Sequence, residues 1–324
     1  MTGGPPAVDS SVLIVIPCLN EATSLPALLT LLTAENPDAR IVVADGGSTD
    51  GSRAIIAQRA AVDPAIVLLD NPERIQSAGI NRAVTAFGAD AQWLVRIDAH
   101  CTYPAGYVAA LLAAATRHQA ASVVVPMVSR GNGCFQTAAA AAQNSKIGTG
   151  GSPHRHVGTG RYVDHGHHAL MDLAKFRAVG GYRSDMSHNE DAELDLRIGK
   201  AGGRIWLEPG LALGYFPRDS ALGLARQYWN YGRGRARTLA LHRLRPKLRQ
   251  MLPLIVPPAL ALALLAPWWP LCGLPLLGWA GLCLGAGVVI GIRERNICAA
   301  ASGFAAMIMH TSWGCGFLWF LLTN

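Results

Sequence analysis

Charged residues are scarce in this chain and are missing altogether from two long stretches near its carboxyl end. Asp, Glu, Lys and Arg make up 15% of the 324 residues, whereas hydrophobic residues make up 51%. None of the four charged types occurs in residues 250–292 or in residues 296–324. About twenty uncharged, mostly apolar residues are enough for a helix to cross a bilayer. The composition therefore excludes a chain that is soluble throughout and predicts a membrane region at residues 251–324.

This region has room for three membrane-spanning helices, which we expect near residues 251–268, 271–292 and 297–322. Only Arg293, Glu294 and Arg295 interrupt the uncharged sequence, and Trp268 and Trp269 suit the far interface. Three crossings predict a carboxyl terminus on the outer side. The alternative is that one segment is re-entrant or lies on the membrane surface.

Acidic residues are absent from residues 226–249, which contain eight basic residues. The whole chain has a formal net charge of +7, so this segment, at +8, accounts for all of the excess. A basic run next to a membrane segment marks the cytoplasmic side and attracts anionic lipids. We therefore interpret residues 218–250 as a basic amphipathic segment at the interface, with membrane lipids and not nucleic acid as its partner.

Closely spaced cysteine pairs are also missing. The seven cysteines contain no CxxC pair, and this scatter predicts reduced thiols in packing roles. The first residues, MTGGPPAVDSS, have neither a basic start nor a long apolar core, so we expect no signal peptide. Residues 1–217 are therefore expected to form a cytoplasmic domain attached to the inner cell membrane by the segments that follow.

Strands and helices alternate along the first part of the chain. Apolar runs at residues 12–16, 41–44, 66–69 and 93–97 predict buried strands, and the sequence between them predicts helices at 22–32, 53–61 and 77–87. This order predicts an α/β fold with a mostly parallel sheet and flanking helices. Further helices are expected at 107–117, 131–142, 171–179 and 187–203, and further strands at 122–128, 204–207 and 211–215.

Two common nucleotide-binding signatures are missing, the Walker loop and the GxGxxG turn, which argues against a hydride-transfer cofactor. In their place, the turn DGGSTDG at residues 45–51 follows the second predicted strand. Its glycines let the backbone approach a ligand, and Asp45 at the strand end can accept from a base or ribose. The structural alternative is a plain glycine-rich turn in which Asp50 caps the next helix.

Asp98 and His100 directly follow the strand predicted at residues 93–97. Residues i and i+2 of an extended segment project to the same side, and open α/β sheets bind ligands at the carboxyl ends of their strands. The pair is therefore a candidate site for one divalent cation, unless Asp98 simply belongs to a turn beside a surface histidine.

Other histidines and glycines give weaker indications. His165, His167 and His168 have no partner at zinc-finger spacing, and adjacent histidines on a strand face apart, so we expect no zinc site. Residues 146–160 are rich in glycine and lack periodicity, which fits either a mobile acceptor loop or a plain connector.

Acidic residues gather at the start of the helix predicted at 187–203. Asn189, Glu190 and Asp191 would complement the helix dipole there, or one carboxylate would act as a general base at a cleft. Helical spacing places Asp195 one turn after Asp191 and predicts an ion pair between Glu193 and Arg197. Both interpretations of the cluster stay open at this stage.

Together, PCLNE (17–21), DGGSTDGS (45–52), the Asp98/His100 pair, NEDAELDLRIGKAGG (189–203) and RQYWNYGRGR (226–235) resemble the family 2 glycosyltransferases of GT-A fold. The similarity is greatest to the membrane-attached glucosyltransferases of succinoglycan biosynthesis. It extends over roughly residues 11–240 and continues into the membrane region.

The resemblance implies an inverting transferase that moves a sugar from a nucleotide-sugar donor, usually a UDP-hexose, to a hydroxyl of a lipid-linked or polysaccharide acceptor in cell-surface glycan synthesis. Asp98 and His100 stand where the family has its metal-binding DxD, and the histidine favours Mn²⁺ over Mg²⁺. Asp191 corresponds to the catalytic base. By motif position the donor-binding residues are Pro17, Asn20, Glu21, Asp45, Gly47 and Asp98.

A last group corresponds to residues that contact the diphosphate and the acceptor in related enzymes: Glu190, Arg226, Gln227, Trp229 and Arg233. The order of residues 227–231 departs from the Gln-x-x-Arg-Trp of those enzymes, so the individual roles stay open. Two other functions also stay open. One is a polyprenyl-phosphate sugar synthase, whose phosphate acceptor needs no strong base, and the other is a non-catalytic assembly partner with a nucleotide-binding fold.

Overall fold

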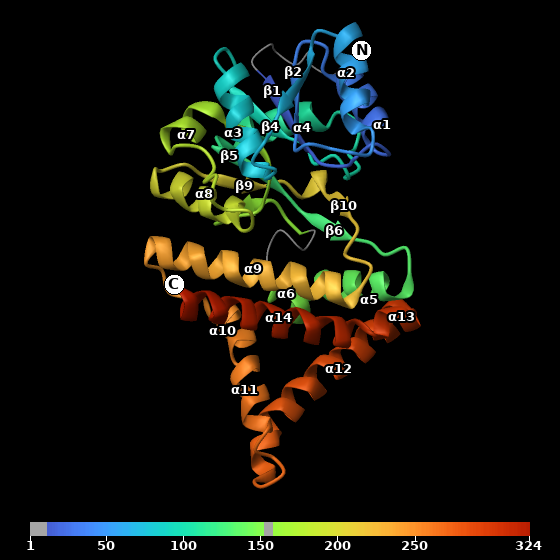
Figure 1. Ribbon diagram of the computed structural model, residues 1–324, viewed down its shortest axis with the longest axis vertical. Coiled ribbons are helices and arrows are strands. Elements are labelled where there is room, and N and C mark those ends of the chain that lie inside the picture. The colour runs from blue at the N-terminus through green and yellow to red at the C-terminus, as the bar shows by residue number, and fades with distance from the viewer. Residues whose placement is uncertain (1–11, 152–157) are drawn as a thin grey trace. The chain divides into compact units, whose positions relative to one another are not determined.

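The computed structural model describes residues 12–151 and 158–324 (Figure 1). The segment on which the expectation about a signal peptide depends, and most of the second half of the glycine-rich segment 146–160, lie outside the described residues. The chain divides into two compact units. The first comes from residues 1–126 and 157–213, and the second from residues 127–156 and 214–324. The segment that starts at Met127 thus interrupts the stretch 1–217 that we expected to be one continuous domain.

The described part of the first unit is built on an eight-stranded mixed sheet with the order β3-β2-β1-β4-β8-β5-β9-β7. The strands are β1 (Val12–Cys18), β2 (Arg40–Asp45), β3 (Ile66–Asp70), β4 (Trp93–Arg96), β5 (Ser122–Val125), β7 (Arg161–Tyr162), β8 (His167–Asp172) and β9 (Ile205–Leu207). The first four are parallel, whereas β8 runs antiparallel to both β4 and β5.

Helices cover both faces of this sheet. Successive side chains of β1 point to opposite faces, and because all of them are apolar, both faces must be covered. Ile14 and Ile16 pack in one apolar cluster with α1 (Leu25–Glu35), α2 (Ser52–Val62) and α4 (Tyr107–His118). Leu13 and Val15 point to the other face. The helices on that face are α3 (Gln76–Phe87), α7 (Leu173–Ala178) and α8 (Glu190–Lys200). The predicted α/β architecture is confirmed.

The main departure from the prediction is β8. The helix expected at residues 171–179 begins only at Leu173, and the residues before it form a strand in the middle of the sheet. The expected strand 122–128 is divided at Pro126 into β5 and β6 (Met127–Ser129), and β6 pairs with β10 (Leu213–Tyr215) after the short helix η2 (Pro209–Leu211). Proline cannot donate a hydrogen bond to a sheet, which explains this break.

The second unit is mostly helical. Its elements are α5 (Cys134–Gln143), α6 (Lys146–Thr149), α9 (Ala221–His242), α10 (Leu248–Leu254), α11 (Val256–Ala263), η3 (Pro270–Gly273), α12 (Leu274–Glu294), α13 (Ile297–Ala300) and α14 (Ser302–Thr323). Within this unit α9 and α14 lie side by side, and α11 and α12 project from them as a hairpin (Figure 1).

Two helical segments in the described residues are long and apolar enough to cross a membrane, Pro270–Glu294 and Ile297–Thr323. The crossing expected at residues 251–268 is not one helix but the shorter α10 and α11, with Pro253 inside the first and prolines at the start of the second. Proline breaks the helical hydrogen-bond ladder. Three crossings are therefore not supported.

The expectation that all cysteines are reduced is wrong for one pair, because Cys134 of α5 and Cys298 of α13 form a disulfide. These residues are 164 positions apart, so their spacing carried no signal; the packing of α13 against α5 brings them together. The remaining cysteines are free thiols: Cys18, Cys101, Cys272, Cys283 and Cys315.

The disulfide can be tested by peptide mapping. When the protein is alkylated without reduction and digested, we expect one linked peptide pair containing Cys134 and Cys298. Cys134→Ser should free Cys298 for alkylation, whereas the matched Cys283→Ser should leave the linked pair intact. Quantitative alkylation of both cysteines in the unreduced wild-type protein would contradict this assignment.

Candidate functional site

Three neighbouring parallel strands, β2, β1 and β4, end at the same edge of the sheet, and the loops that follow them are joined by hydrogen bonds. The backbone N–H of Asn20 donates to the Ser48 hydroxyl at 2.9 Å, and the Asn20 carbonyl Oδ1 accepts from the Thr49 N–H at 2.8 Å. Asn20 has a φ of 59°, a left-handed conformation that asparagine tolerates. The PCLNE and DGGSTDGS segments therefore form one surface at this edge.

Asp45 is the buried centre of that surface. Its carboxylate accepts from the backbone N–H of Gly47 at 3.1 Å and lies 3.2 Å from the Arg53 guanidinium. Gly47 has a φ of +83°, which strains any side-chain-bearing residue. Pro17 lies beside this turn, within β1 and paired in register with Ala44. The alternative role considered for Asp50, capping the next helix, is also present, since the Asp50 carboxylate accepts a hydrogen bond from the Ser52 N–H at the start of α2.

The two residues proposed as metal ligands lie together after β4. Donor atoms of Asp98, His100 and Cys101 are all within 4.8 Å of one another. His100 is exposed, and its Nδ1 lies 2.9 Å from Glu21 Oε1, which leaves Nε2 available to a cation. Burial raises the pKa of Cys101 to about 12, so its protonated thiol is a poor ligand. A carboxylate with an imidazole suits a divalent cation such as Mn²⁺.

Asp98 also belongs to a buried polar network. Arg96 Nε lies 3.1 Å from its Oδ1, and His167 Nε2 lies 3.3 Å from its Oδ2. Burial by itself raises the pKa of Asp98, but the charge of Arg96, helped by His167, outweighs burial and holds that pKa well below its usual range. Asp98 is therefore ionised and oriented from both sides.

Arg96 connects this carboxylate to a second one. Its Nη1 donates to Asp191 Oδ1 at 2.7 Å, so one buried guanidinium bridges the end of β4 and the start of α8. Burial disfavours the charged form of Asp191, yet Arg96 and then His168 lower its pKa below the usual value. The pKa of the adjacent Glu190 is raised, first by burial and then by the charge of Asp191. Asp191 is thus the ionised member of the pair.

Sequence reasoning missed the part played by β8. His168 Nε2 lies 2.9 Å from Asp195 Oδ1, and its Nδ1 lies 2.5 Å from the Tyr182 hydroxyl and 3.6 Å from Asp191. His167, the neighbouring strand residue, faces Asp98 instead. The two histidines therefore face apart as expected, and each fixes a different carboxylate. Recognising residues 167–172 as a strand would have revealed this.

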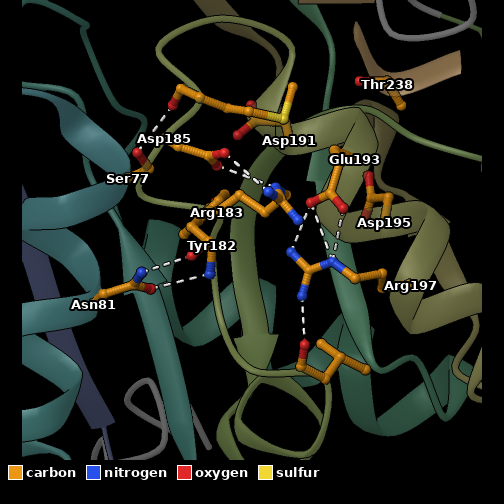
Figure 2. A network of polar contacts seen from close by, with 12 residues as sticks. Ser77, Asn81, Tyr182, Arg183, Asp185, Asp191, Glu193, Asp195, Arg197 and Thr238 are labelled. Atoms are coloured by element: carbon orange, nitrogen blue, oxygen red, sulfur yellow. Dashed lines mark hydrogen bonds and ion pairs between the residues drawn. The ribbon is translucent and has the colours of Figure 1, made fainter. Parts of the chain in front are cut away.

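The helical spacing predicted on α8 is confirmed. Arg197 donates to Glu193 over one turn, with the closest pair of atoms 2.6 Å apart, and Glu193 is fully buried (Figure 2). Asp195 lies one turn after Asp191 and reaches it through His168. Glu193 is consequently part of the packing of α8, separate from the Arg96 network.

The residues expected to contact diphosphate and acceptor lie on α9 in the second unit, apart from Glu190. There Gln227 donates to the hydroxyls of Tyr215 at 2.8 Å and Tyr231 at 3.0 Å. The Trp229 ring lies 6.1 Å from that of Trp319. Arg226 and Arg233 are exposed.

The Arg96 network yields a stability prediction. Arg96→Met leaves the buried Asp98 and the largely buried Asp191 without their shared cation, which should lower the free energy of unfolding by about 3–5 kcal/mol. Arg82→Met is the matched control, because the Arg82 ion pair with Glu73 is 3.9 Å long and exposed, and its loss should cost about 0.5 kcal/mol or less. Denaturant unfolding in detergent measures both, and equal effects would contradict the network.

Comparison with known proteins now identifies the fold. The model of glycosyl transferase family 2 matches residues 13–179. The chain is 51% identical over 311 residues to succinoglycan biosynthesis protein ExoA of Rhizobium meliloti, covering 95% of this chain and 94% of that protein.

Among solved structures, it is similar to mannosyltransferase PcManGT from Pyrobaculum calidifontis, determined in complex with GDP-Man and Mn²⁺. The TM-score is 0.63, with 17% identity over 98% of this chain and 91% of that one. At this identity the likeness concerns the fold, which is the expected GT-A type. The sheet, the site at its edge and the family match lead to one conclusion: the chain is a glycosyltransferase and belongs to glycosyltransferase family 2.

Proposed function

We propose that this enzyme transfers a sugar from a nucleotide-sugar donor to a hydroxyl of a lipid-linked or polysaccharide acceptor, with inversion at the anomeric carbon. The observation that supports this most directly is the buried Arg96, which holds Asp98 and Asp191 in one network. A group suited to a metal-bound diphosphate and a group suited to proton removal are thereby fixed relative to each other.

The donor side is formed by the joined loops after β1 and β2. We assign the nucleoside to the surface around Asn20, Asp45 and Gly47, bounded by Pro17 and Glu21. The relative from Rhizobium meliloti is a succinoglycan biosynthesis protein, and the solved neighbour was bound to GDP-Man and Mn²⁺. For this chain we propose a UDP-hexose donor and a polysaccharide of the succinoglycan type.

Asp98 and His100 would hold the divalent cation, and the Glu21 carboxylate would orient His100. When bound, such a cation neutralises negative charge on a leaving nucleoside diphosphate. Arg96 keeps Asp98 ionised, and His167 limits the directions in which its carboxylate can turn.

Asp191 is the proposed general base. As the acceptor oxygen attacks the anomeric carbon, a new carbon–oxygen bond forms and the bond to the diphosphate breaks on the opposite face. The hydroxyl proton passes to an Asp191 oxygen. Because Arg96 lowers the pKa of Asp191, this base is ionised before the acceptor arrives, although the same pairing weakens its proton affinity.

Metal removal tests the cation site. We expect chelator to abolish transfer, added Mn²⁺ to restore it, and Asp98→Asn to be nearly inactive. His100→Ala should raise the Mn²⁺ concentration needed for half-maximal rate by about tenfold or more, since loss of even an outer-shell partner of a metal ligand typically costs on this scale. UDP affinity should change little in that variant.

His118→Ala is the matched control, because His118 stacks on Trp206 and takes no part in the Arg96 network. Full activity of both site variants in chelator would refute a metal-dependent reaction at this position.

Substitution of Asp191 tests the base. Asp191→Asn should retain donor binding and lose transfer by about a hundredfold or more, the usual scale for a general base. Asp185→Asn is a suitable control, because Asp185 forms an exposed ion pair with Arg183. Glu193 is not, since its buried carboxylate supports α8.

Transfer rate and UDP-sugar affinity are measured together on purified protein. Normal transfer by Asp191→Asn with an inactive Glu190→Gln would assign the base to Glu190. Normal transfer by both Asp191→Asn and Glu190→Gln would show that neither carboxylate acts as a base. That result would favour a phosphate acceptor, which needs no strong base.

A further inference from the structure

The last helix, α14, is apolar enough to cross a membrane, but its neighbour is not. In the second unit α14 packs along the basic helix α9. Near the start of both helices, Leu224 belongs to one apolar cluster with Ala305 and Met309. Near their ends, Ala236 and Phe317 share another. The two helices therefore run in the same direction, in contact over most of their lengths.

Their backbones approach closely in the middle. A Cβ atom added to Gly232 would lie 2.1 Å from the carbonyl oxygen of Trp313. A Cβ added to Gly316 would lie 2.2 Å from the carbonyl oxygen of Trp229. A glycine on each helix thus packs directly against the backbone of the other helix, and α9 and α14 form one tightly packed layer.

This layer cannot cross a bilayer, because α9 bears four arginines. Arg226 and Arg233 are exposed, and Arg235 and Arg237 are half-buried. Arginine near the middle of a hydrocarbon layer is among the costliest residues there, whereas at the membrane surface it faces anionic headgroups favourably. Since α14 accompanies α9 along its length, α14 must stay at the surface with it.

The hairpin formed by α11, η3 and α12 is apolar and exposed, unlike the arginine-bearing α9/α14 layer. It projects from the α9/α14 layer (Figure 1), and it contains no charged residue before Arg293 and Glu294, which end α12. Leu264, Trp268, Leu271 and Leu282 are each more than 70% exposed. Apolar surface of this extent on a free element indicates contact with lipid. The hairpin has the composition of an inserted element, and both of its ends return to the α9/α14 layer.

We propose that the hairpin of α11, η3 and α12 is what enters the bilayer, while α9 and α14 lie on its cytoplasmic surface against anionic headgroups. The carboxyl terminus is then cytoplasmic, the reverse of the outer position predicted by counting hydrophobic segments. This inference rests on the proposed function in one respect, because a lipid-linked acceptor places the enzyme at a membrane.

Reporters joined after Asn324 of the full chain test the topology. Green fluorescent protein should be fluorescent there, and alkaline phosphatase, which is active only outside the cytoplasm, should be inactive. As a second measurement, a membrane-impermeant maleimide should label Asn324→Cys no more than the wild-type protein in intact spheroplasts, because Cys272 and the other free thiols are present in both, and more than the wild type in inverted vesicles. An active phosphatase, or labelling of Asn324→Cys above the wild-type level in intact spheroplasts, would overturn the proposal.

A substitution in the hairpin tests insertion. Leu282→Arg should lower the fraction of protein that stays in membranes after alkaline carbonate washing by about threefold or more. Val62→Arg on α2, where Val62 is 80% exposed, should leave it unchanged. Unaltered retention of Leu282→Arg would contradict insertion of α12. Failure of sugar transfer in detergent would instead count against the proposed function and leave the topology standing.

Discussion

The guanidinium of Arg96 is buried between Asp98 and Asp191, and most of the site depends on that one shared charge. An unpaired buried carboxylate is costly, so each of the three groups requires the others in place. Arg96 ends strand β4 and Asp98 follows it, whereas Asp191 lies in α8, 95 positions after Arg96. They meet because β8 lies beside β4 and carries His167, which contacts Asp98, and His168, which contacts Asp191. The sheet order is thus what converts distant sequence motifs into a single ionised site.

Much of this arrangement was predictable where the physics is local. The apolar runs of β1 to β4 identified buried strands, and the i, i+4 spacing of Glu193 and Arg197 gave an ion pair. Donor atoms of Asp98 and His100 do lie together, but β4 ends at Arg96, and the two residues belong to a turn in which the Cys101 N–H donates to the Asp98 carbonyl, not to an extended strand. The rest depends on distant partners. Nothing near residue 167 indicated that β8 would insert antiparallel into the sheet, and nothing near Cys134 pointed to Cys298.

In the second unit, hydropathy likewise could not predict which surfaces the apolar helices contact. By length and composition the segments containing α12 and α14 both qualify for crossing a membrane, and the only charged residues in these two helices are Arg293 and Glu294 at the end of α12. What separates them is the surface each one contacts: α14 packs on an arginine-bearing helix, while α12 turns its leucines outward. A hydropathy window covers only the residues of the helix itself. It therefore contains no information about the neighbouring helices, which decide where that helix lies.

The disulfide and the packing of α5 have a consequence for how the enzyme can be divided. Helix α5 belongs to the second unit although it precedes residue 217, and its alanines Ala139 and Ala142 pack beside Ala306 of α14. A shortened protein ending at residue 217 would retain α5 without the helices that cover it and would expose that apolar face to water. The membrane-proximal helices are therefore an integral part of the folded core, and a water-soluble transferase cannot be obtained simply by cutting them off.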